Sequence, residues 1–448
     1  MIDYQLLGAV LFGVAVLLVL ILRFKIQAFV ALLIASISVG VFSGMPPKEI
    51  VTTMQQGMGS TLGFVALVVG LGAIFGAILE QSGGAEALAK YLISKFGDKR
   101  ASWALMLAGF LVAIPVFFDV AFIILIPIVY SLQRRTKKSL LLYGIPLLAG
   151  LAITHSFIPP TPGPVAVADI LKADLGWVIL FGFIVGIPTA IVSGPLFARY
   201  IAGKIYIEAP EIKNNSKEIT EYPAVKLIVL IIGVPIVLIV CNTFLNSPLV
   251  SDTLLSAKSK AWFGMIGHPF VALIIANLLA WYILGVKRGF SKEKLQKIAT
   301  DSMAPAGIII LLTGAGGVFK QMLINTGTGE MLANYFANAG IGVLFFSFFT
   351  AVVVRVLQGS ATVAMITAAG VTAPLILNTD TSQIDKALLV IAIASGASIL
   401  SHVNDSGFWL VGKYLGLTEK QTFKSWTMMT TILALTSFTI ISIVYLII

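Results

Sequence analysis

Charged residues are scarce in this chain. They make up 11% of its 448 residues, while 58% are hydrophobic. Soluble domains carry roughly 25% charged residues, so an ordinary soluble domain is excluded. Long apolar runs, for example Leu6–Leu22, Ile179–Phe197 and Trp426–Ile448, approach or reach the ~20 residues that cross the hydrocarbon core of a bilayer. The composition predicts an all-α polytopic membrane protein whose surroundings are the lipid bilayer.

Cysteine and histidine are almost absent as well. The single cysteine, Cys241, excludes a disulfide framework. The three histidines show no spacing typical of a metal site. The chain has no Walker motif for ATP and no evident nucleophile–base pair for an intramembrane enzyme. We therefore expect no metal, no cofactor and no enzymatic activity.

Lysine and arginine outnumber aspartate and glutamate by 30 to 20. Their placement nevertheless argues against a nucleic acid partner. They lie in short connectors between apolar runs, as in the cytoplasmic loops of membrane proteins, and form no single basic face.

Two stretches of the chain repeat one sequence without a gap. Gly70–Leu92 reads GLGAIFGAILEQSGGAEALAKYL, and Gly314–Phe336 reads GAGGVFKQMLINTGTGEMLANYF. Internal duplication in a glycine-interrupted apolar chain is typical of secondary transporters, whose substrate site lies between the repeats. We expect a first repeat over residues 1–203, a polar cytoplasmic linker over 204–225 and a second repeat over 226–448.

Each repeat carries two interrupted apolar stretches in the same order. Ala101–Leu132 and Ile341–Leu377 are broken near their middle by polar or charged residues. Two spans of ~20 residues plus a turn need more chain than this, so we expect re-entrant helical hairpins rather than two full spans. Leu140–Asp169 and Ala387–Leu415 follow as broken transmembrane helices, one interrupted by prolines and the other by a polar cluster.

Ordinary spans and short amphipathic segments surround these stretches. The expected spans that bear on the structure below are Ser60–Leu79, Ala304–Leu323 and Trp262–Leu284, and the expected interfacial segments are Ala85–Phe96 and Gly329–Asn338.

The positive charges predict how the repeats are oriented. Five crossings and one hairpin per repeat place the second repeat upside down relative to the first. If the N-terminus lies outside, 23 of the 30 lysines and arginines fall in inside connectors and 5 in outside connectors. The bias favours inverted-topology repeats with both the N-terminus and the C-terminus outside. It does not distinguish a hairpin from two full spans, since both return to the same side.

Two polar residues mark the first repeat at membrane depth. Asp119 interrupts an apolar stretch in the first hairpin, where a carboxylate must face water, find a partner or bind a proton. We expect it to couple transport to protons; the alternative is a structural hydrogen bond at the hairpin tip. His155 stands at the first helix break and can exchange a proton near neutral pH. We assign it to proton coupling and substrate binding, with capping of a helix end as the alternative.

Arg355 lies in the second hairpin, just before the sequence QGSAT. A guanidinium at that depth requires an anionic partner, which the substrate, Asp405 or Asp119 can supply. Neighbouring residues offer hydrogen bonds to hydroxyl groups or a close backbone approach. Those expected to bind the substrate are Gln358, Gly359, Ser360 and Thr362.

The second broken helix contains the polar cluster Asn404, Asp405 and Ser406. Asn404 and Ser406 are candidate substrate ligands, and Asp405 is a candidate second proton site. Helix capping is the competing interpretation for Asn404 and Ser406, because asparagine and serine are good N-caps, and a cation ligand is the alternative role for Asp405.

Several segments together resemble the gluconate:proton symporter family of bacterial permeases over essentially the full length. They are GLGAIFGAILEQSGGAE, FFDVAFIILIPIVYSL, HSFIPPTPGPVAVA, GAGGVFKQML, QGSATVAMITAAG and NDSGFWLVGKYLG. The resemblance implies proton-coupled uptake of gluconate or a related small sugar acid across the cytoplasmic (inner) membrane, with a proton gradient as driving force. The chain departs from the family pattern at Asp119, where members often carry Glu, and at Thr161, where they often carry His.

Other functions stay open at this point. The substrate can be another small carboxylate, such as D-serine or glycerate, and sodium can replace the proton. A channel is the alternative from a different class, although a pore would not need two hairpins and two broken helices at matched positions. The sequence does not fix the oligomeric state, so a homo-oligomer remains open.

Overall fold

The structure is a computed structural model that describes residues 4–210, 222–246, 257–327, 342–376, 380–403 and 405–448. These residues form helices and connecting segments, with no strand among them. Seven of the described helical segments are long and apolar enough to cross a membrane. Four further apolar helices are shorter. The prediction of an all-α polytopic membrane protein is confirmed.

The first 204 residues form ten α-helices. Their bounds are α1 Tyr4–Leu22, α2 Ala28–Phe42, α3 Pro47–Gln81, α4 Gly84–Phe96, α5 Ala101–Val112, α6 Phe118–Thr136, α7 Leu141–Phe157, α8 Pro162–Leu171, α9 Leu175–Ile191 and α10 Phe197–Lys204. The expected interfacial segment corresponds to α4. The expected span Ser60–Leu79 is only the apolar part of α3, which Pro47 begins from its first helical position.

The second part of the chain follows a similar order. Its helices are α11 Val225–Leu245, α12 Ala257–Ile266, α13 Pro269–Ala280, α14 Lys292–Asn325, α16 Val343–Gln358, α17 Ala361–Ile376, α18 Gln383–Ser398, α19 Ser406–Leu415, α20 Glu419–Thr422 and α21 Met428–Ile447. The expected span Trp262–Leu284 is divided, because His268 caps α13 and Pro269 begins it. The interfacial segment expected over Gly329–Asn338 lies outside the described residues.

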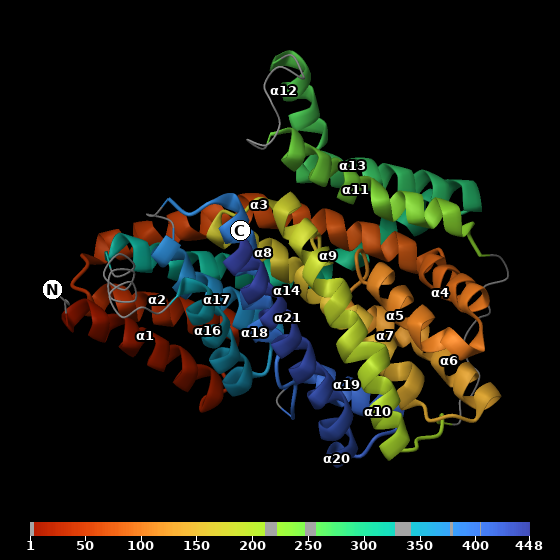
Figure 1. Ribbon diagram of the computed structural model, residues 1–448. Helices are drawn as coiled ribbons and strands as arrows, with labels where there is room; N and C mark the ends of the chain where they lie inside the picture. The colour runs from red at the N-terminus through yellow and green to blue at the C-terminus, as the bar shows by residue number, and fades with distance from the viewer. Residues whose placement is uncertain (1–3, 211–221, 247–256, 328–341, 377–379, 404) are drawn as a thin grey trace.

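Helices α3 and α14, which carry the duplicated sequence, pack against each other along their length (Figure 1). At 35 residues, α3 is roughly 52 Å long. Asn325 at the end of α14 donates to Thr53 near the start of α3 at 2.9 Å, so the two helices run antiparallel. Gly57 and Gly317 permit the close approach: a Cβ on Gly57 would lie 2.7 Å from the carbonyl oxygen of Gly317.

Four breaks between helices fall where the sequence predicts interruptions. They lie at residues 113–117 between α5 and α6, 158–161 between α7 and α8, 359–360 between α16 and α17, and 399–405 between α18 and α19. Pro115, Pro159 and Pro160 occupy the first two, and Gly359 takes a positive φ of 94° in the third. α16 packs on both α17 and α18, whereas α5 packs chiefly on α7.

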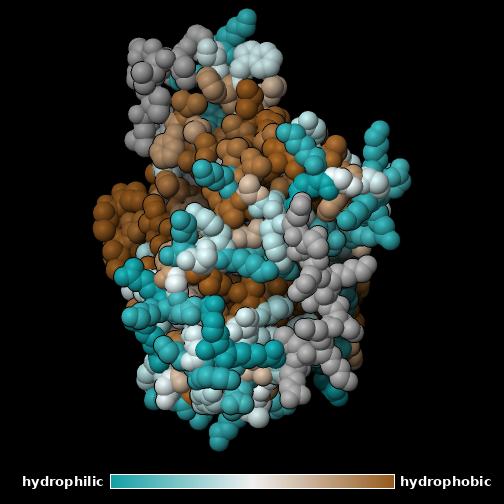
Figure 2. Space-filling model, turned by 90° about the vertical axis from the view of Figure 1, so that its right-hand side faces the viewer, coloured by the Kyte–Doolittle hydropathy of each residue, from teal (hydrophilic) through white to brown (hydrophobic). Residues whose placement is uncertain are grey.

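Connectors that the charge distribution places on the same side also lie together. Arg288 donates to the Ser82 carbonyl at 2.8 Å, joining two predicted inside connectors. The backbone N–H of Asp174 donates to Gln383 at 2.9 Å, joining two predicted outside connectors. Figure 2 shows the end of the molecule that carries α4 and α6: hydrophilic residues cover much of its lower part, and hydrophobic residues gather above them.

Candidate substrate site

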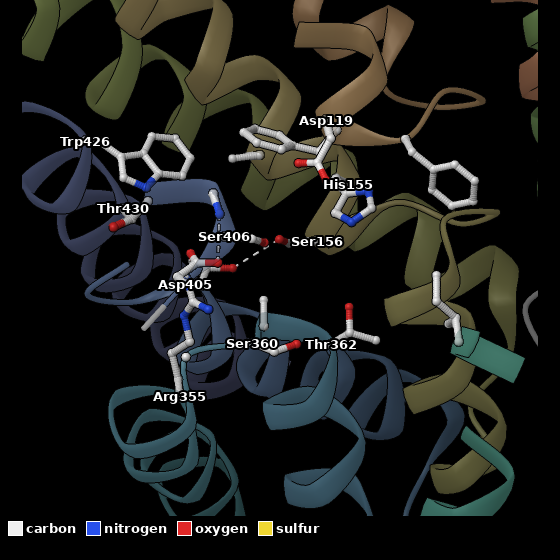
Figure 3. Close-up of a pocket in the computed structure, with 18 of the residues that line it drawn as sticks. Asp119, His155, Ser156, Arg355, Ser360, Thr362, Asp405, Ser406, Trp426 and Thr430 are labelled. Carbon is white, nitrogen blue, oxygen red and sulfur yellow. Dashed lines mark hydrogen bonds and ion pairs between the residues drawn. The ribbon is translucent and has the colours of Figure 1, made fainter. Parts of the chain in front are cut away.

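Three of the four helix breaks, those at 113–117, 359–360 and 399–405, border a cavity of about 550 Å³ (Figure 3). Its walls come from the starts of α6, α17 and α19, the end of α7, and parts of α14, α16 and α21. Nine residues predicted as site residues line this single cavity. They are Asp119, His155, Arg355, Gln358, Gly359, Ser360, Thr362, Asp405 and Ser406. The tenth, Asn404, lies outside the described residues.

Arg355 lies on the last turn of α16 and is 3% exposed. Its Nε donates to the Ile399 carbonyl at 3.2 Å, and its Nη2 donates to Asp405 Oδ2 at 2.5 Å. Its Nη1 is buried and has no hydrogen-bond partner among the described residues. Asp405 is thus the protein's own anionic partner for Arg355, and Nη1 is the guanidinium nitrogen left without a partner among the described residues.

Asp405 is held by several donors besides Arg355. Its Oδ2 accepts a bond from Ser401 Oγ, and its Oδ1 accepts one from the Gly407 backbone N–H at 3.1 Å, which caps α19. Ser401 in turn accepts from Trp426 Nε1 at 2.6 Å. Capping was expected of Asn404 and Ser406, but Asp405 is the residue that caps α19, and the same carboxylate also fixes the orientation of Arg355 (Figure 3).

The α16–α17 turn presents polar groups to the cavity. Gln358 Oε1 accepts from the Ser360 backbone N–H at 2.8 Å, and Ser360 Oγ accepts from Val363 N–H at 3.3 Å. Gly359 has the left-handed conformation that this tight turn requires. Ser360 and Thr362 lie on the cavity side in Figure 3, where their hydroxyl groups can meet a polyhydroxylated ligand.

Three helices begin at the cavity. They are α6, α17 and α19. The first backbone N–H groups of a helix carry partial positive charge, so three such ends favour an anion. By contrast α8 begins beside a smaller hollow lined by Thr161 and Pro162, so its N-terminal amides do not face the main cavity.

Asp119 and His155 lie on the opposite wall from Arg355 (Figure 3). Asp119 is in the first turn of α6, exposed to the cavity, and its carboxylate makes no hydrogen bond among the described residues. A structural hydrogen bond at the hairpin tip is thus not its role in this structure. His155 stacks at a tilt on Phe118, and its buried Nδ1 has no partner there either.

Sequence analysis missed several lining residues. Ser156 and Ser398 join the two broken helices through a hydroxyl–hydroxyl bond of 3.1 Å. Trp426, in the π-helical turn Phe423–Thr427, and Thr430, in α21, line the same cavity. Each of these residue types is ordinary inside an apolar helix, so no charge or interruption in the sequence marks them. Within the described part of the chain, no group of three or more His, Cys, Asp or Glu residues is placed to hold a metal ion.

Comparisons with known proteins identify the family. The chain matches the family model described as GntP family permease over residues 5–447. It is 41% identical to the gluconate permease of Pseudomonas aeruginosa over 436 residues, which cover 96% of each chain. It is 40% identical to the low-affinity gluconate transporter of Escherichia coli K12 over 422 residues, which cover 94% of each chain.

A solved transporter shares the fold. The YdaH transporter of Alcanivorax borkumensis superposes with a TM-score of 0.63 over 89% of each chain, at 16% sequence identity. The all-helical membrane architecture, the transporter fold and the family match over nearly the whole length lead to one assignment. The chain belongs to the GntP family of permeases and is a multi-pass transporter, not an enzyme.

Proposed function

We propose that this permease imports gluconate or a related small sugar acid together with protons. The observation that carries the proposal is the buried Arg355 in the wall of a cavity lined by hydroxyl groups, with its Nη1 left without a hydrogen-bond partner among the described residues. A sugar acid has one carboxylate for the guanidinium and several hydroxyls for such a wall. The cavity volume of about 550 Å³ lies within the range of small-molecule pockets.

The binding pose follows from the two walls. The substrate carboxylate meets Arg355 Nη1 and the positive ends of α17 and α19, and its hydroxyls meet Gln358, Ser360 and Thr362. Ser406 at the start of α19 and Asn404 belong to the same proposed binding set. The printed names of the relatives, a gluconate permease and a gluconate transporter, support the choice of substrate.

Asp119 is the proposed proton carrier. It faces the cavity opposite Arg355 and forms no ion pair in the described part of the chain, so a proton can bind it without breaking a structural contact. His155 lies on the same wall of the cavity as Asp119 (Figure 3) and is the second residue that we assign to proton coupling. Asp405 is the weaker candidate, because its carboxylate already accepts hydrogen bonds from Arg355, Ser401 and Gly407, so a proton would have to disturb these contacts.

The proposed topology is two inverted repeats in the inner membrane, with both termini outside. The antiparallel packing of α3 and α14 supports it, because two copies of one sequence run in opposite directions. The charge bias of the connectors supports it independently.

Uptake of labelled sugar acids by proteoliposomes tests this function. We expect gluconate to accumulate when the outside is acidic and not when only a sodium gradient is imposed. Uncoupling the pH gradient should abolish accumulation. Accumulation driven by sodium alone, or of D-serine or glycerate in preference to gluconate, would contradict the proposal. Rapid equilibration with no dependence on either gradient would indicate a channel.

A further inference from the structure

Ser401 lies in the break between α18 and α19, and every polar group of this buried residue is hydrogen-bonded. Its backbone N–H donates to Thr430 Oγ1 at 3.2 Å, and its carbonyl accepts a bond from Thr427 Oγ1. Its Oγ accepts from Trp426 Nε1 at 2.6 Å and donates to Asp405 Oδ2. The π-helical turn before α21 and the first turn of α21 therefore hold this irregular segment in one position.

The side-chain bonds of Ser401 belong to a chain that ends at Arg355. The Trp426 indole N–H donates to the Ser401 hydroxyl, and the hydroxyl donates to Asp405. The same Asp405 oxygen accepts from Arg355 Nη2 at 2.5 Å. An indole N–H is a donor only, and a hydroxyl has a single proton. The direction of each bond in the chain is therefore fixed by the chemistry of its members.

The Trp426 side chain also reaches the opposite wall of the cavity. Its ring lies tilted against the ring of Phe118, with 5.7 Å between the two centroids, and Phe118 begins α6. Trp426 is 4% exposed and lines the cavity. The ring thus packs on one wall while the N–H bonds to the other. Replacement by phenylalanine separates these two contributions, because it keeps an aromatic ring and removes the donor.

We infer that Trp426 is a positioning residue for Arg355 and acts through Ser401 and Asp405. The indole N–H orients the Ser401 hydroxyl, the hydroxyl orients the Asp405 carboxylate, and the carboxylate holds the guanidinium in place. Trp426 does not have to touch the substrate for this role. The inference rests on the proposed binding of an anion by Arg355 and adds a residue that determines the position of that group.

Hydrogen exchange at Arg355 tests the inference with no substrate present. In detergent-purified protein with isotope-labelled arginine, the NMR signal of the Arg355 Nε–H is assigned by its loss in Arg355→Lys. This buried N–H donates to the Ile399 carbonyl at 3.2 Å, so its exchange with water reports how firmly the guanidinium is held. Trp426→Phe and Ser401→Ala should each speed the exchange roughly tenfold, as for one lost buried hydrogen bond. Trp426→Phe should add nothing in a Ser401→Ala background.

Two matched variants control for the substitutions. Trp409→Phe removes an indole N–H that donates to the Val403 carbonyl, in the same helix break, at 2.8 Å. Ser395→Ala removes an equally buried hydroxyl that donates to the Ile391 carbonyl of its own helix at 2.7 Å. Both should leave the exchange at Arg355 unchanged. Unchanged exchange in Trp426→Phe, or an equal increase in Trp409→Phe, would overturn the inference.

Ligand binding gives a second readout. Trp426→Phe should weaken the binding of gluconate roughly tenfold and that of an uncharged polyol of similar size far less, because only the anion uses Arg355. In an Arg355→Gln background the same replacement should weaken gluconate binding no further. Equal losses for the two ligands, or equal losses in the two backgrounds, would make Trp426 a structural residue and reject the inference.

These outcomes are separable from those of the proposed function, since the exchange measurement needs no substrate. Faster exchange in Trp426→Phe, in a protein that does not bind gluconate, keeps the positioning residue and rejects the substrate. Unchanged exchange in a protein that binds gluconate rejects the positioning residue alone.

Discussion

The protein's own hydrogen bonds use only part of the Arg355 guanidinium. Asp405 and the Ile399 carbonyl hold Nη2 and Nε, and Nη1 is left without a partner among the described residues. The sequence raised two alternatives, in which Arg355 either binds the substrate carboxylate or is held by an internal aspartate. The structure shows the contact with the aspartate, and Nη1 is the donor that the proposed contact with the substrate would use.

Replacing Arg355 by Gln should remove the preference for an anion. Losing one partner of a buried charge pair costs ~2–5 kcal/mol, or roughly 30-fold to several thousandfold in affinity. Binding of gluconate and of an uncharged polyol of similar size, measured by competition, checks this. The Arg355→Lys variant should also bind gluconate more weakly, because an ammonium group lacks the bidentate hydrogen-bond geometry of a guanidinium. An equal loss for both ligands would make Arg355 a structural brace.

Replacing Asp119 by Asn should uncouple the permease from protons. The side chain keeps its size and faces the same cavity, so folding should be preserved, and exchange of internal for external substrate should continue. Accumulation against a gradient should disappear, because Asn cannot carry the proton. Counterflow and pH-driven uptake measured on one preparation separate these activities. Wild-type accumulation by the variant would rule out Asp119 as the carrier.

The charged residues of the cavity could be predicted because they interrupt apolar stretches. Several serine and threonine residues of the cavity could not. Asp119, Arg355 and Asp405 stand out because a charge at membrane depth requires a reason. Ser398 and Thr430 do not stand out, since each also donates to a carbonyl of its own helix, at 2.7 and 2.9 Å. Their place at the cavity depends on how distant helices pack, which no local pattern records.

Helices α3 and α14 show a similar limit of sequence-based prediction at the scale of whole helices. Their apolar halves were predicted as ordinary spans, but each helix continues through a polar segment to 35 or 34 residues. The polar part of α3 packs on α14 at Gly57, whereas the polar part of α14 is mostly exposed, and hydropathy alone predicts neither arrangement. The helix breaks were predicted well, since proline, glycine and charge interrupt apolar runs visibly.

The close packing of α3 on α14 gives a matched pair of glycine variants. Gly57→Ala should destabilise the protein, by ~1–3 kcal/mol for overpacking, because the new Cβ meets backbone atoms that cannot move aside. Gly59→Ala on the same helix meets nothing within 4 Å and should gain up to ~1 kcal/mol in helix propensity. Thermal unfolding in detergent compares them. Equal shifts for the two variants would refute the packing argument.

The molecule as a whole is organised by its duplication. The repeats were recognisable because Gly70–Leu92 and Gly314–Phe336 align without a gap. Their relative orientation required counting crossings and charges, and the antiparallel α3–α14 pair agrees with the result. The two ends of the α3–α14 pair differ, with a cavity of about 390 Å³ beside Lys294 and Lys297 and close helix packing at Gly57, and this difference was not predictable from two similar sequences.

Sided labelling checks the proposed topology. In a Cys241→Ala background, Lys138→Cys and Ile448→Cys should react from opposite faces of the membrane. The first lies in the basic connector after α6, and the second ends the chain. If both react from one face, the second repeat is not inverted and the charge argument fails.

Proton movement driven by gluconate tests the proposed coupling most directly. Proteoliposomes are loaded with a pH-sensitive dye, held without any ion gradient, and given gluconate on the outside. We expect the lumen to acidify at a rate that rises with gluconate and saturates, and to remain unchanged with Asp119→Asn or with a neutral polyol. Gluconate uptake without acidification, or acidification that requires sodium, would contradict the account.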